Sequence, residues 1–458
     1  MAIIIGGVTL VGAPAWSLTR PDRALRVATG LAAETLCAEV FVSGLDPDRV
    51  FADSVASRSG LNLLAWGMRR ELDRAQGEVR ISWLGLQPSR AVFRGLAGCQ
   101  LVGPGARVAP PPVLQPLASA DLPAIAGPGL VGPADAAIAK ALDAAFAEPA
   151  KGAPRRVRAI VVVHEGRVIA ERYAAGVGPD TPLPGYSLTK TALNALSDVM
   201  SAKGRLDMRA PAPVAAWRGA GDPRAAITPE QLLRMTSGLD AAETHSGFDP
   251  TSRMLYVEPD MAGFAATLPL KAPPGTSFAY QSPNSLILGR VIADLAGGGE
   301  AGVLNFARGE LFGPLGMTTA VLPTDAAGTP MVSAGMLASA RDWAKLGMLF
   351  LNDGMAGERR ILPPGWVAWS SSQTLDRGYG AGLWLNNGSA AEPQMPLTRA
   401  GMPPDAVYGS GDLGQRLYIV PSQRLVVVRL AASSPPDFGL RGDMEMMRGL
   451  TAALGGAR

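Results

Sequence analysis

Two β-hairpin patterns stand far apart in this 458-residue chain, and they constrain its fold more than any other feature. Runs of β-branched residues on either side of a short polar turn predict paired strands. The first hairpin comprises Val157–Val163 and Val168–Tyr173, and the second comprises Arg416–Val420 and Arg424–Leu430. Because the segment between them reads mainly as helix and loop, the simplest packing pairs both hairpins in one sheet. The sequence therefore predicts an α/β (α+β) fold, in which helices flank an antiparallel sheet and a helical domain is inserted.

Proline and glycine divide the chain into parts. The segment Gly103–Pro133 is dense in both, which excludes regular helix and sheet and favours an extended linker or a surface-wrapping loop. We assign residues 1–30 to a leader, 31–103 to a small α+β module, 104–133 to the linker and 134–458 to the main domain. Outside the inserted segment, helices are expected over Leu64–Gln76, which is polar and inside the module, over Ala134–Glu148 and over Asp443–Leu454.

The leader contains an uncharged, mostly apolar run, Ala2–Leu18. This pattern is typical of an export signal or an uncleaved membrane anchor, although no Lys or Arg precedes it and a buried first strand is the alternative. We expect a periplasmic or otherwise exported protein, with membrane association through this segment as an option. Export would place Cys37 and Cys99 in an oxidising compartment, where they could form a disulfide; buried free thiols are the other expectation.

The composition excludes several classes of partner and cofactor. Lys and Arg number 42 against 39 Asp and Glu, and a net charge of +3 is too near balance for a nucleic-acid-binding protein. The two histidines, His164 and His245, and the two cysteines form no zinc-ligand spacing. GxGxxG and Walker motifs are absent from the sequence. We therefore expect no metal, no cofactor and no nucleic-acid partner.

The most informative short motif is Ser187-Leu188-Thr189-Lys190, at the start of an amphipathic helical pattern that follows a Pro/Gly break. Residues i and i+3 share a helical face, so the Lys190 amine can meet the Ser187 hydroxyl. A neutral lysine amine can accept the proton of a serine hydroxyl, which makes a nucleophile without histidine. By itself the spacing is weak, because an ordinary helix capped by Ser187 with a solvated Lys190 would look the same.

Several further motifs share one order with a known superfamily. They include VVVHEGRVIAERYAAG, GYSLTK, ITPEQLLRMTSGLD, SFAYQSPNSLILGRVI and GSGDLGQRLYIVPSQRLVVV. Over about residues 134–454 the chain resembles the serine β-lactamase and penicillin-binding superfamily. The resemblance implies a sheet domain with an inserted helical domain, an active site between them and an acyl-enzyme mechanism.

The resemblance also assigns a second motif, Tyr280-Gln281-Ser282. In related class C β-lactamases and esterases, a Tyr-x-Asn or Tyr-x-Ser triplet faces the nucleophile, which implies that Tyr280 is the proton shuttle and that Ser282 contacts substrate. A tyrosine hydroxyl ordinarily ionises only near pH 10, so this role needs a nearby cation, for which Lys190 is the natural candidate. A packed tyrosine with a hydrogen-bonded hydroxyl is the alternative.

The third motif is Gly411-Asp412-Leu413-Gly414-Gln415, at the entry to the closing hairpin. The superfamily carries Lys-Thr-Gly or His-x-Gly here, so Asp412 stands where a cation is expected. A carboxylate about 4 Å from the carboxylate of a β-lactam would cost about 1 to 4 kcal/mol, which disfavours penicillin hydrolysis. By position, the backbone N–H groups of Ser187 and Gln415 would form the oxyanion hole, and Gly414 would leave the strand edge open to substrate.

These residues resemble most the esterase and 6-aminohexanoate-dimer hydrolase branch, whose members cleave small amides or esters. The expectation is a serine hydrolase in which Ser187, Lys190 and Tyr280 are catalytic, while Ser282, Asp412, Gly414 and the loop residue His245 contact substrate. A D,D-peptidase or weak β-lactamase is the alternative among enzymes. A non-catalytic envelope binding protein on the same fold is the alternative from another class.

Overall fold

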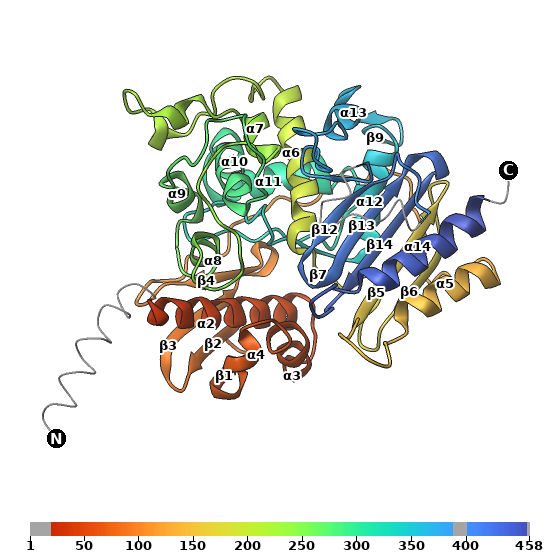
Figure 1. The fold of residues 1–458 in the computed structure, drawn as a ribbon, viewed down its shortest axis with the longest axis horizontal. Coiled ribbons are helices and arrows are strands. Elements are labelled where there is room, and N and C mark those ends of the chain that lie inside the picture. The colour runs from red at the N-terminus through yellow and green to blue at the C-terminus, as the bar shows by residue number, and fades with distance from the viewer. Residues whose placement is uncertain (1–19, 388–400, 456–458) are drawn as a thin grey trace, which may run out of the picture.

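The computed structural model describes residues 20–387 and 401–455, and its centre is a six-stranded antiparallel sheet (Figure 1). The strand order is β11-β12-β13-β14-β5-β6. The bounds are Trp384–Leu385 for β11, Val407–Gly411 for β12, Gln415–Val420 for β13, Leu425–Ala431 for β14, Val157–His164 for β5 and Arg167–Tyr173 for β6. Strands β14 and β5 pair directly, Val428 opposite Val161, so the two predicted hairpins do meet in one sheet.

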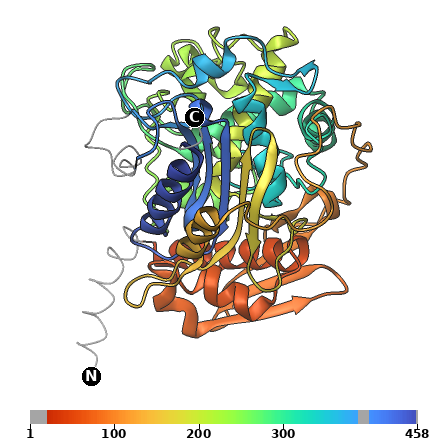
Figure 2. The same ribbon diagram turned by 90° about the vertical axis from the view of Figure 1, so that its right-hand side faces the viewer.

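Alternate residues of the central strands face two separate apolar clusters, as expected for strands that are covered on both faces. One face is covered by α5 (Ala136–Phe146) and α14 (Leu440–Gly455), which lie against each other in Figure 2. The other face is covered by α12 (Ala340–Leu351). The helices predicted at both ends of the main domain are therefore present.

A helical region is inserted between β6 and α12, as predicted (Figure 1). Its helices are α6 (Thr189–Ala202), α7 (Pro229–Leu233), α8 (Pro250–Tyr256), α9 (Met261–Ala266), α10 (Ser282–Leu295) and α11 (Gly299–Ala307). Two-residue strands β7 (Leu183–Pro184) and β8 (Leu337–Ala338) pair next to the start of α6. The short elements β9 (Met355–Ala356), β10 (Arg359–Arg360) and α13 (Trp366–Ser370) follow α12.

The amino-terminal module is an antiparallel sheet of four strands in chain order, with α2 packed on it. Its elements are α2 (Pro21–Cys37), α3 (Pro47–Val50), α4 (Leu61–Leu64), β1 (Met68–Asp73), β2 (Glu78–Trp83), β3 (Leu86–Phe93) and β4 (Cys99–Val102). Helix α2 lies between this sheet and the rest of the protein, where it contacts α8 (Figure 1). The predicted boundary at residue 31 falls inside α2, so the module includes the residues from Pro21 onward. The apolar run predicted as a leader, up to Leu18, lies outside the described residues.

The polar helix predicted over Leu64–Gln76 is wrong, because the middle of this segment, Met68–Asp73, forms β1. Every residue of β1 pairs with β2, from Met68 opposite Trp83 to Asp73 opposite Glu78. The strand is the edge of its sheet, and four of its six residues are exposed, so its side chains carry little of the alternation that identifies a strand. Pairing with β2 overrides the helical preference of the local sequence.

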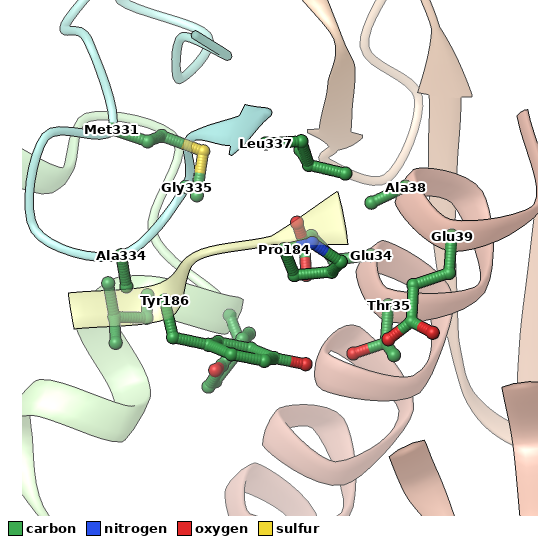
Figure 3. Close-up of a pocket in the computed structure, with 12 residues that line it drawn as sticks. Glu34, Thr35, Ala38, Glu39, Pro184, Tyr186, Met331, Ala334, Gly335 and Leu337 are labelled. Carbon is green, nitrogen blue, oxygen red and sulfur yellow. The ribbon is translucent and has the colours of Figure 1, made fainter. Parts of the chain in front are cut away.

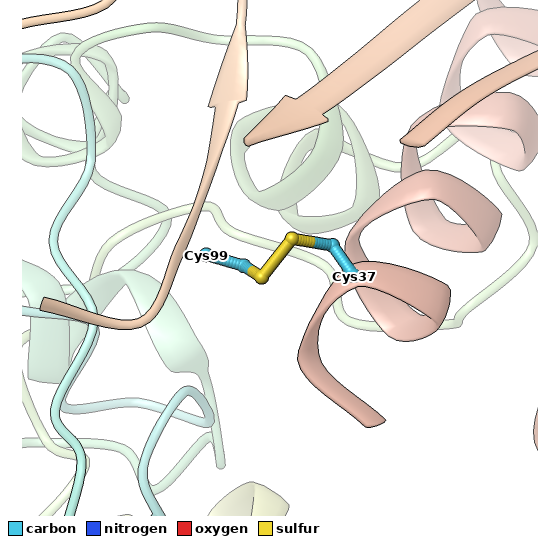
Figure 4. Close-up of a disulfide and its surroundings, with 2 residues drawn as sticks. All are labelled: Cys37 and Cys99. Atoms are coloured by element: carbon cyan, nitrogen blue, oxygen red, sulfur yellow. A yellow bond between two sulfur atoms is a disulfide. The ribbon is translucent and has the colours of Figure 1, made fainter. Parts of the chain in front are cut away.

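A disulfide joins Cys37, at the end of α2, to Cys99, at the start of β4 (Figure 4). Of the two expectations for these cysteines, the structure has the bridge and not the free thiols. Both residues are buried in the main apolar cluster. The bridge therefore fixes the helix of the module to its sheet across a sequence separation of 62 residues.

The segment predicted as a linker contains neither helix nor strand and wraps over the surface of the main domain. Its backbone is held at several points: the Asp121 N–H donates to Pro314 O at 2.8 Å, and the Ile125 carbonyl accepts from Val168 N at 2.8 Å. Farther along, Val131 O accepts from Glu171 N at 2.9 Å. Of the two forms expected for this segment, the structure therefore has the surface-wrapping loop.

Candidate active site

Ser187 lies in a tight turn, Tyr186–Leu188, that leads directly into α6. The turn is held from both sides: Gly185 N donates to Met336 O at 2.9 Å, and Thr189 Oγ1 donates to Tyr186 O at 2.6 Å. Gly185 has no room for a side chain, since a Cβ there would lie 2.2 Å from the Trp343 ring. These contacts fix the position of Ser187 between the sheet and the helical region.

Lys190 follows in the first turn of α6, and its side chain is almost completely buried, with 1% exposure. Its Nζ donates to Ser187 Oγ at 3.1 Å and to the Ser333 carbonyl at 2.8 Å. It also lies 3.4 Å from Ser282 Oγ, at the start of α10. The predicted contact between the amine and the serine hydroxyl is therefore present, and the backbone of residue 333 orients the amine.

Tyr280, in the loop before α10, brings an aromatic ring to the same place. Lys190 Nζ lies 4.8 Å from the centre of this ring. The ring stacks on Trp384 with a centroid distance of 5.4 Å, and Tyr379 meets it edge-on at 5.7 Å. The structure thus brings Ser187, Lys190 and Tyr280 together, as the sequence predicted, and the aromatic neighbours fix the ring of Tyr280.

Ser187 and Tyr280 open into a cleft of about 490 Å³ between the β12–β13 edge of the sheet and the loops of the helical region. The size is within the range of small-molecule sites in proteins. Carboxylates reach it from Glu243, Asp412 and Asp437. The other lining residues are His245, Trp384, Tyr408, Ser410, Gly411, Arg416, Tyr418, Pro436, Phe438 and Leu440.

Glu243 lines this cleft, and Ser282, which is buried and does not line it, is hydrogen-bonded to Glu243. Ser282 donates to the Glu243 carboxylate twice, through its backbone N–H and through its hydroxyl at 3.0 Å. A carboxylate at the amino-terminal end of α10 is stabilised by the free N–H groups and the dipole of the helix. Sequence analysis selected Ser282 and missed Glu243. The signal was available, because Glu243 is two residues before His245 in the loop expected to rim the cleft.

His245 lies at the cleft, as expected, but largely in solvent. Its side chain is 68% exposed, and its Nε2 lies 3.9 Å from Glu243 Oε1. Asp412 also lines the cleft, where it forms an ion pair with Arg58 of the amino-terminal module. Burial opposes ionisation of Asp412, but Arg58 and His245 outweigh this effect and hold the pKa of the carboxyl below its usual range.

Two predictions at the closing hairpin differ from the structure. Gly414 is not open to substrate: a Cβ there would lie 2.4 Å from Arg429 Nη1 and 2.5 Å from the Phe438 carbonyl. Its φ of +84° explains the glycine, because the turn between β12 and β13 needs a left-handed residue. Gln415, whose backbone N–H is the second predicted donor of the oxyanion hole, is buried and is not among the residues that line the cleft; its side-chain Nε2 donates to Ala431 O at 2.8 Å. The residues of this hairpin that line the cleft with Ser187 are Tyr408, Ser410, Gly411, Asp412, Arg416 and Tyr418.

The approach of β12 to the nucleophile turn is tight at Gly411. A Cβ on this residue would lie 2.3 Å from the Gly185 carbonyl, two residues before Ser187. Backbone therefore faces backbone on this side of the cleft. Within residues 20–387 and 401–455, no group of His, Cys, Asp and Glu side chains has the arrangement of a metal site.

Known proteins resemble this chain in sequence and in fold. A curated relative, the 6-aminohexanoate-dimer hydrolase of Paenarthrobacter ureafaciens, is 26% identical over 298 residues, which cover 61% of this chain and 73% of the relative. A penicillin-binding protein homolog from Caulobacter crescentus has a TM-score of 0.56 at 17% identity, with 71% of this chain and 100% of that chain covered. The octameric penicillin-binding protein homologue from Pyrococcus abyssi has a TM-score of 0.52 at 19% identity, with 69% and 77% covered.

The family described as Beta-lactamase matches residues 142–448. This range begins inside α5, ends inside α14 and contains the sheet, the inserted helical region and the cleft. The amino-terminal module lies outside it. From its match over most of the sequence, the chain belongs to the β-lactamase family of serine hydrolases.

Proposed function

We propose that this hydrolase cleaves a small amide or ester through an acyl-enzyme on Ser187. The observation that carries the proposal is the contact of 3.1 Å between Lys190 Nζ and Ser187 Oγ, beside Tyr280 and at the mouth of a cleft. A serine is a weak nucleophile unless a base within hydrogen-bond reach takes its proton, and the Lys190 amine is within that reach.

The reaction has two halves. The unprotonated Lys190 amine accepts the Ser187 proton as Oγ attacks the substrate carbonyl, and the resulting tetrahedral oxyanion is stabilised by the backbone N–H of Ser187. As the carbonyl re-forms, the bond to the leaving group breaks, and the proton passes from Lys190 to the departing nitrogen or oxygen. We assign the relay of this proton to the Tyr280 hydroxyl, because the ring of Tyr280 lies beside the amine, with its centre 4.8 Å from Lys190 Nζ. Water then attacks the acyl-enzyme with the same residues acting in the reverse order, which releases the acid and restores Ser187.

Two features favour a small amide or ester over a β-lactam. The curated relative is named for hydrolysis of the 6-aminohexanoate dimer, a linear amide. The cleft presents the carboxylates of Glu243 and Asp437, which would attract the terminal ammonium group of the linear dimer and repel a substrate whose only charge is a carboxylate, as in a simple penicillin. Asp412, at the same cleft, is paired with Arg58 and therefore adds little to this repulsion.

The test compares wild type with Ser187→Ala, Lys190→Ala and Tyr280→Phe on p-nitrophenyl butyrate and on the linear 6-aminohexanoate dimer. We expect each variant to lose at least about 10²-fold in kcat, because each removes the nucleophile or a proton-transfer group. Mass spectrometry after treatment with a fluorophosphonate should locate the adduct on Ser187. Turnover by Ser187→Ala at the wild-type rate would refute the proposal.

The alternatives have their own assays. Efficient hydrolysis of nitrocefin would identify a β-lactamase, and release of terminal D-alanine from a model peptide would identify a D,D-peptidase. A protein that neither turns over these substrates nor reacts with the fluorophosphonate would be a binding protein on this fold.

We also propose that the protein acts in an oxidising compartment outside the cytoplasm. The Cys37–Cys99 disulfide supports this, because structural disulfides persist in such compartments. None of the helices within the described residues is long and apolar enough to cross a membrane. Fractionation of the native host, followed by immunodetection with and without reductant, tests the proposal: protein found only in the cytosol would contradict it.

A further inference from the structure

The side chain of Arg58, in the amino-terminal module, reaches the active site. This residue follows the helical turn that ends at Val55, and its Nε donates to Ser54 O at 2.7 Å, which orients the guanidinium. Its Nη1 pairs with Asp412 Oδ2 at the cleft. The pair joins residues 354 positions apart in the sequence, one in the module and one in the hydrolase domain.

The same guanidinium covers Tyr186, the residue immediately before the nucleophile. Its central carbon lies 5.3 Å from the centre of the Tyr186 ring. Tyr186 has a φ of +45°, a conformation that costs energy for a residue other than glycine and persists only where its surroundings impose it. Figure 3 shows its side chain directed toward Glu34 and Thr35 of α2, across a cavity of about 30 Å³. The module therefore packs on the turn that presents Ser187.

Asp412 is held from a second direction by its own turn. Its Oδ1 accepts from Leu413 N at 2.8 Å, so the carboxylate is fixed between this backbone and Arg58. Stability does not explain the placement of the cation. Arg58 Nη2 is buried without a hydrogen-bond partner among the described residues, and a buried unpaired donor opposes folding.

The electrostatics of the proposed reaction explain better why the Arg58 guanidinium lies beside Asp412. Negative charge develops on the substrate oxygen next to Ser187 during acyl transfer. Asp412 lies at the same cleft, and as an unpaired carboxylate it would repel that charge. Paired with Arg58 it is neutralised and fixed in place.

We propose that Arg58 is a positioning residue of the active site, supplied by the amino-terminal module: it neutralises Asp412 and clamps the Tyr186 turn against the turn that follows β12. This inference rests on the proposed hydrolase function. It gives the module, which lies outside the family match, a part in catalysis.

The test measures kcat and KM for hydrolysis of p-nitrophenyl butyrate by wild type, Arg58→Gln, Arg58→Lys and the double variant Arg58→Gln/Asp412→Asn. Arg58→Gln leaves the carboxylate unpaired, so kcat should fall by about 10- to 10³-fold while KM changes little. The double variant removes both charges and should recover most of this loss. Arg58→Lys keeps the charge but not the planar contact with Tyr186, so it should recover part of it.

Arg49→Gln is the matched control. Arg49 also crosses from the module to the hydrolase domain, where its Nη1 donates to the Ala175 carbonyl at 2.8 Å. That carbonyl follows β6, at the edge of the sheet opposite to β11 and β12. The control should therefore keep the wild-type kcat.

The outcomes are distinct. Full activity of Arg58→Gln, or a folded double variant as slow as Arg58→Gln, would overturn the inference, because in either case the unpaired charge of Asp412 would not be what slows the reaction. If Arg58→Gln fails to fold, the double variant and Arg58→Lys still test the inference, since neither contains an unpaired carboxylate. Both should then retain much of the wild-type kcat, and a folded double variant with very low kcat would overturn the inference. Failure of the proposed function looks different: Ser187→Ala would then hydrolyse the ester as fast as wild type.

Discussion

Gly411 gives the sharpest test of the active-site geometry, because it faces the nucleophile turn through backbone alone. In Gly411→Ala the new Cβ would start 2.3 Å from the Gly185 carbonyl, whereas real Cβ contacts are essentially never below 3.0 Å. The two segments must therefore separate by at least 0.7 Å, the difference between these distances. Neither side can rotate away, since the carbonyl belongs to a turn anchored on Met336.

The expected loss follows from this displacement. A misplacement of about 1 Å at a reacting centre can cost about 10²-fold in rate, so Gly411→Ala should lower kcat by about 10- to 10²-fold. The assay is steady-state hydrolysis of p-nitrophenyl butyrate together with the rate of fluorophosphonate labelling of Ser187. Thermal melting shows whether the variant is folded.

Gly409→Ala, two residues earlier on β12, is the control. Its Cβ would meet Leu188 Cδ2 at 2.8 Å and Thr191 Oγ1 at 3.1 Å, which are ends of side chains that can rotate. This variant should keep most of the activity. A folded Gly411→Ala with the kcat and labelling rate of wild type would refute the reasoning, because it would mean that the position of β12 against the turn does not affect catalysis.

Three further predictions concern stability. Replacing both Cys37 and Cys99 by serine should lower the free energy of unfolding by about 4 kcal/mol, the chain-entropy value for their separation of 62 residues; an unchanged urea midpoint would contradict it. Burial raises the pKa of Asp198 to about 8, so the folded protein binds this proton more tightly than the unfolded chain, and wild-type stability falls as the pH rises from about 4 to 8. Asp198→Asn should abolish that fall, so the difference in melting temperature between this variant and wild type should grow in favour of the variant from about pH 4 to 8. A difference that does not change with pH would contradict a raised pKa for Asp198. Asp443→Ala leaves Arg429 buried without its partner at 2.8 Å and should cost about 3–5 kcal/mol in urea unfolding, whereas a negligible loss would show that the pair is not needed.

The sequence predicted those parts of the fold whose signal is local. The β-branched runs of the two hairpins become β5, β6, β13 and β14, and the spacing of Ser187 and Lys190 places both on one face of a helix. Tyr280 was found by its motif. In each case the residues that form the sequence pattern are close together in the chain and are the same residues that form the strand, the helix turn or the site.

The rest depends on contacts between distant segments. Glu243 belongs to the site because its loop packs on the start of α10, and Arg58 belongs to it because the whole module docks on the hydrolase domain. Neither residue stands in a motif. Gly414 was misread because a glycine in a turn and a glycine facing a ligand look the same in sequence, and only the backbone φ and the neighbouring Arg429 distinguish them.

The arrangement of the central sheet has a consequence during synthesis on the ribosome. Strand β5 emerges early, but its neighbour β14 is translated more than 250 residues later. The separation between Arg58 and Asp412 is larger still, 354 residues. The buried residues of the module belong to the same apolar cluster as those of the hydrolase domain, so the two parts complete one core. A nascent or prematurely terminated chain therefore lacks β14 and Asp412 and has no working hydrolase, which keeps the enzyme silent until nearly all of it has been made.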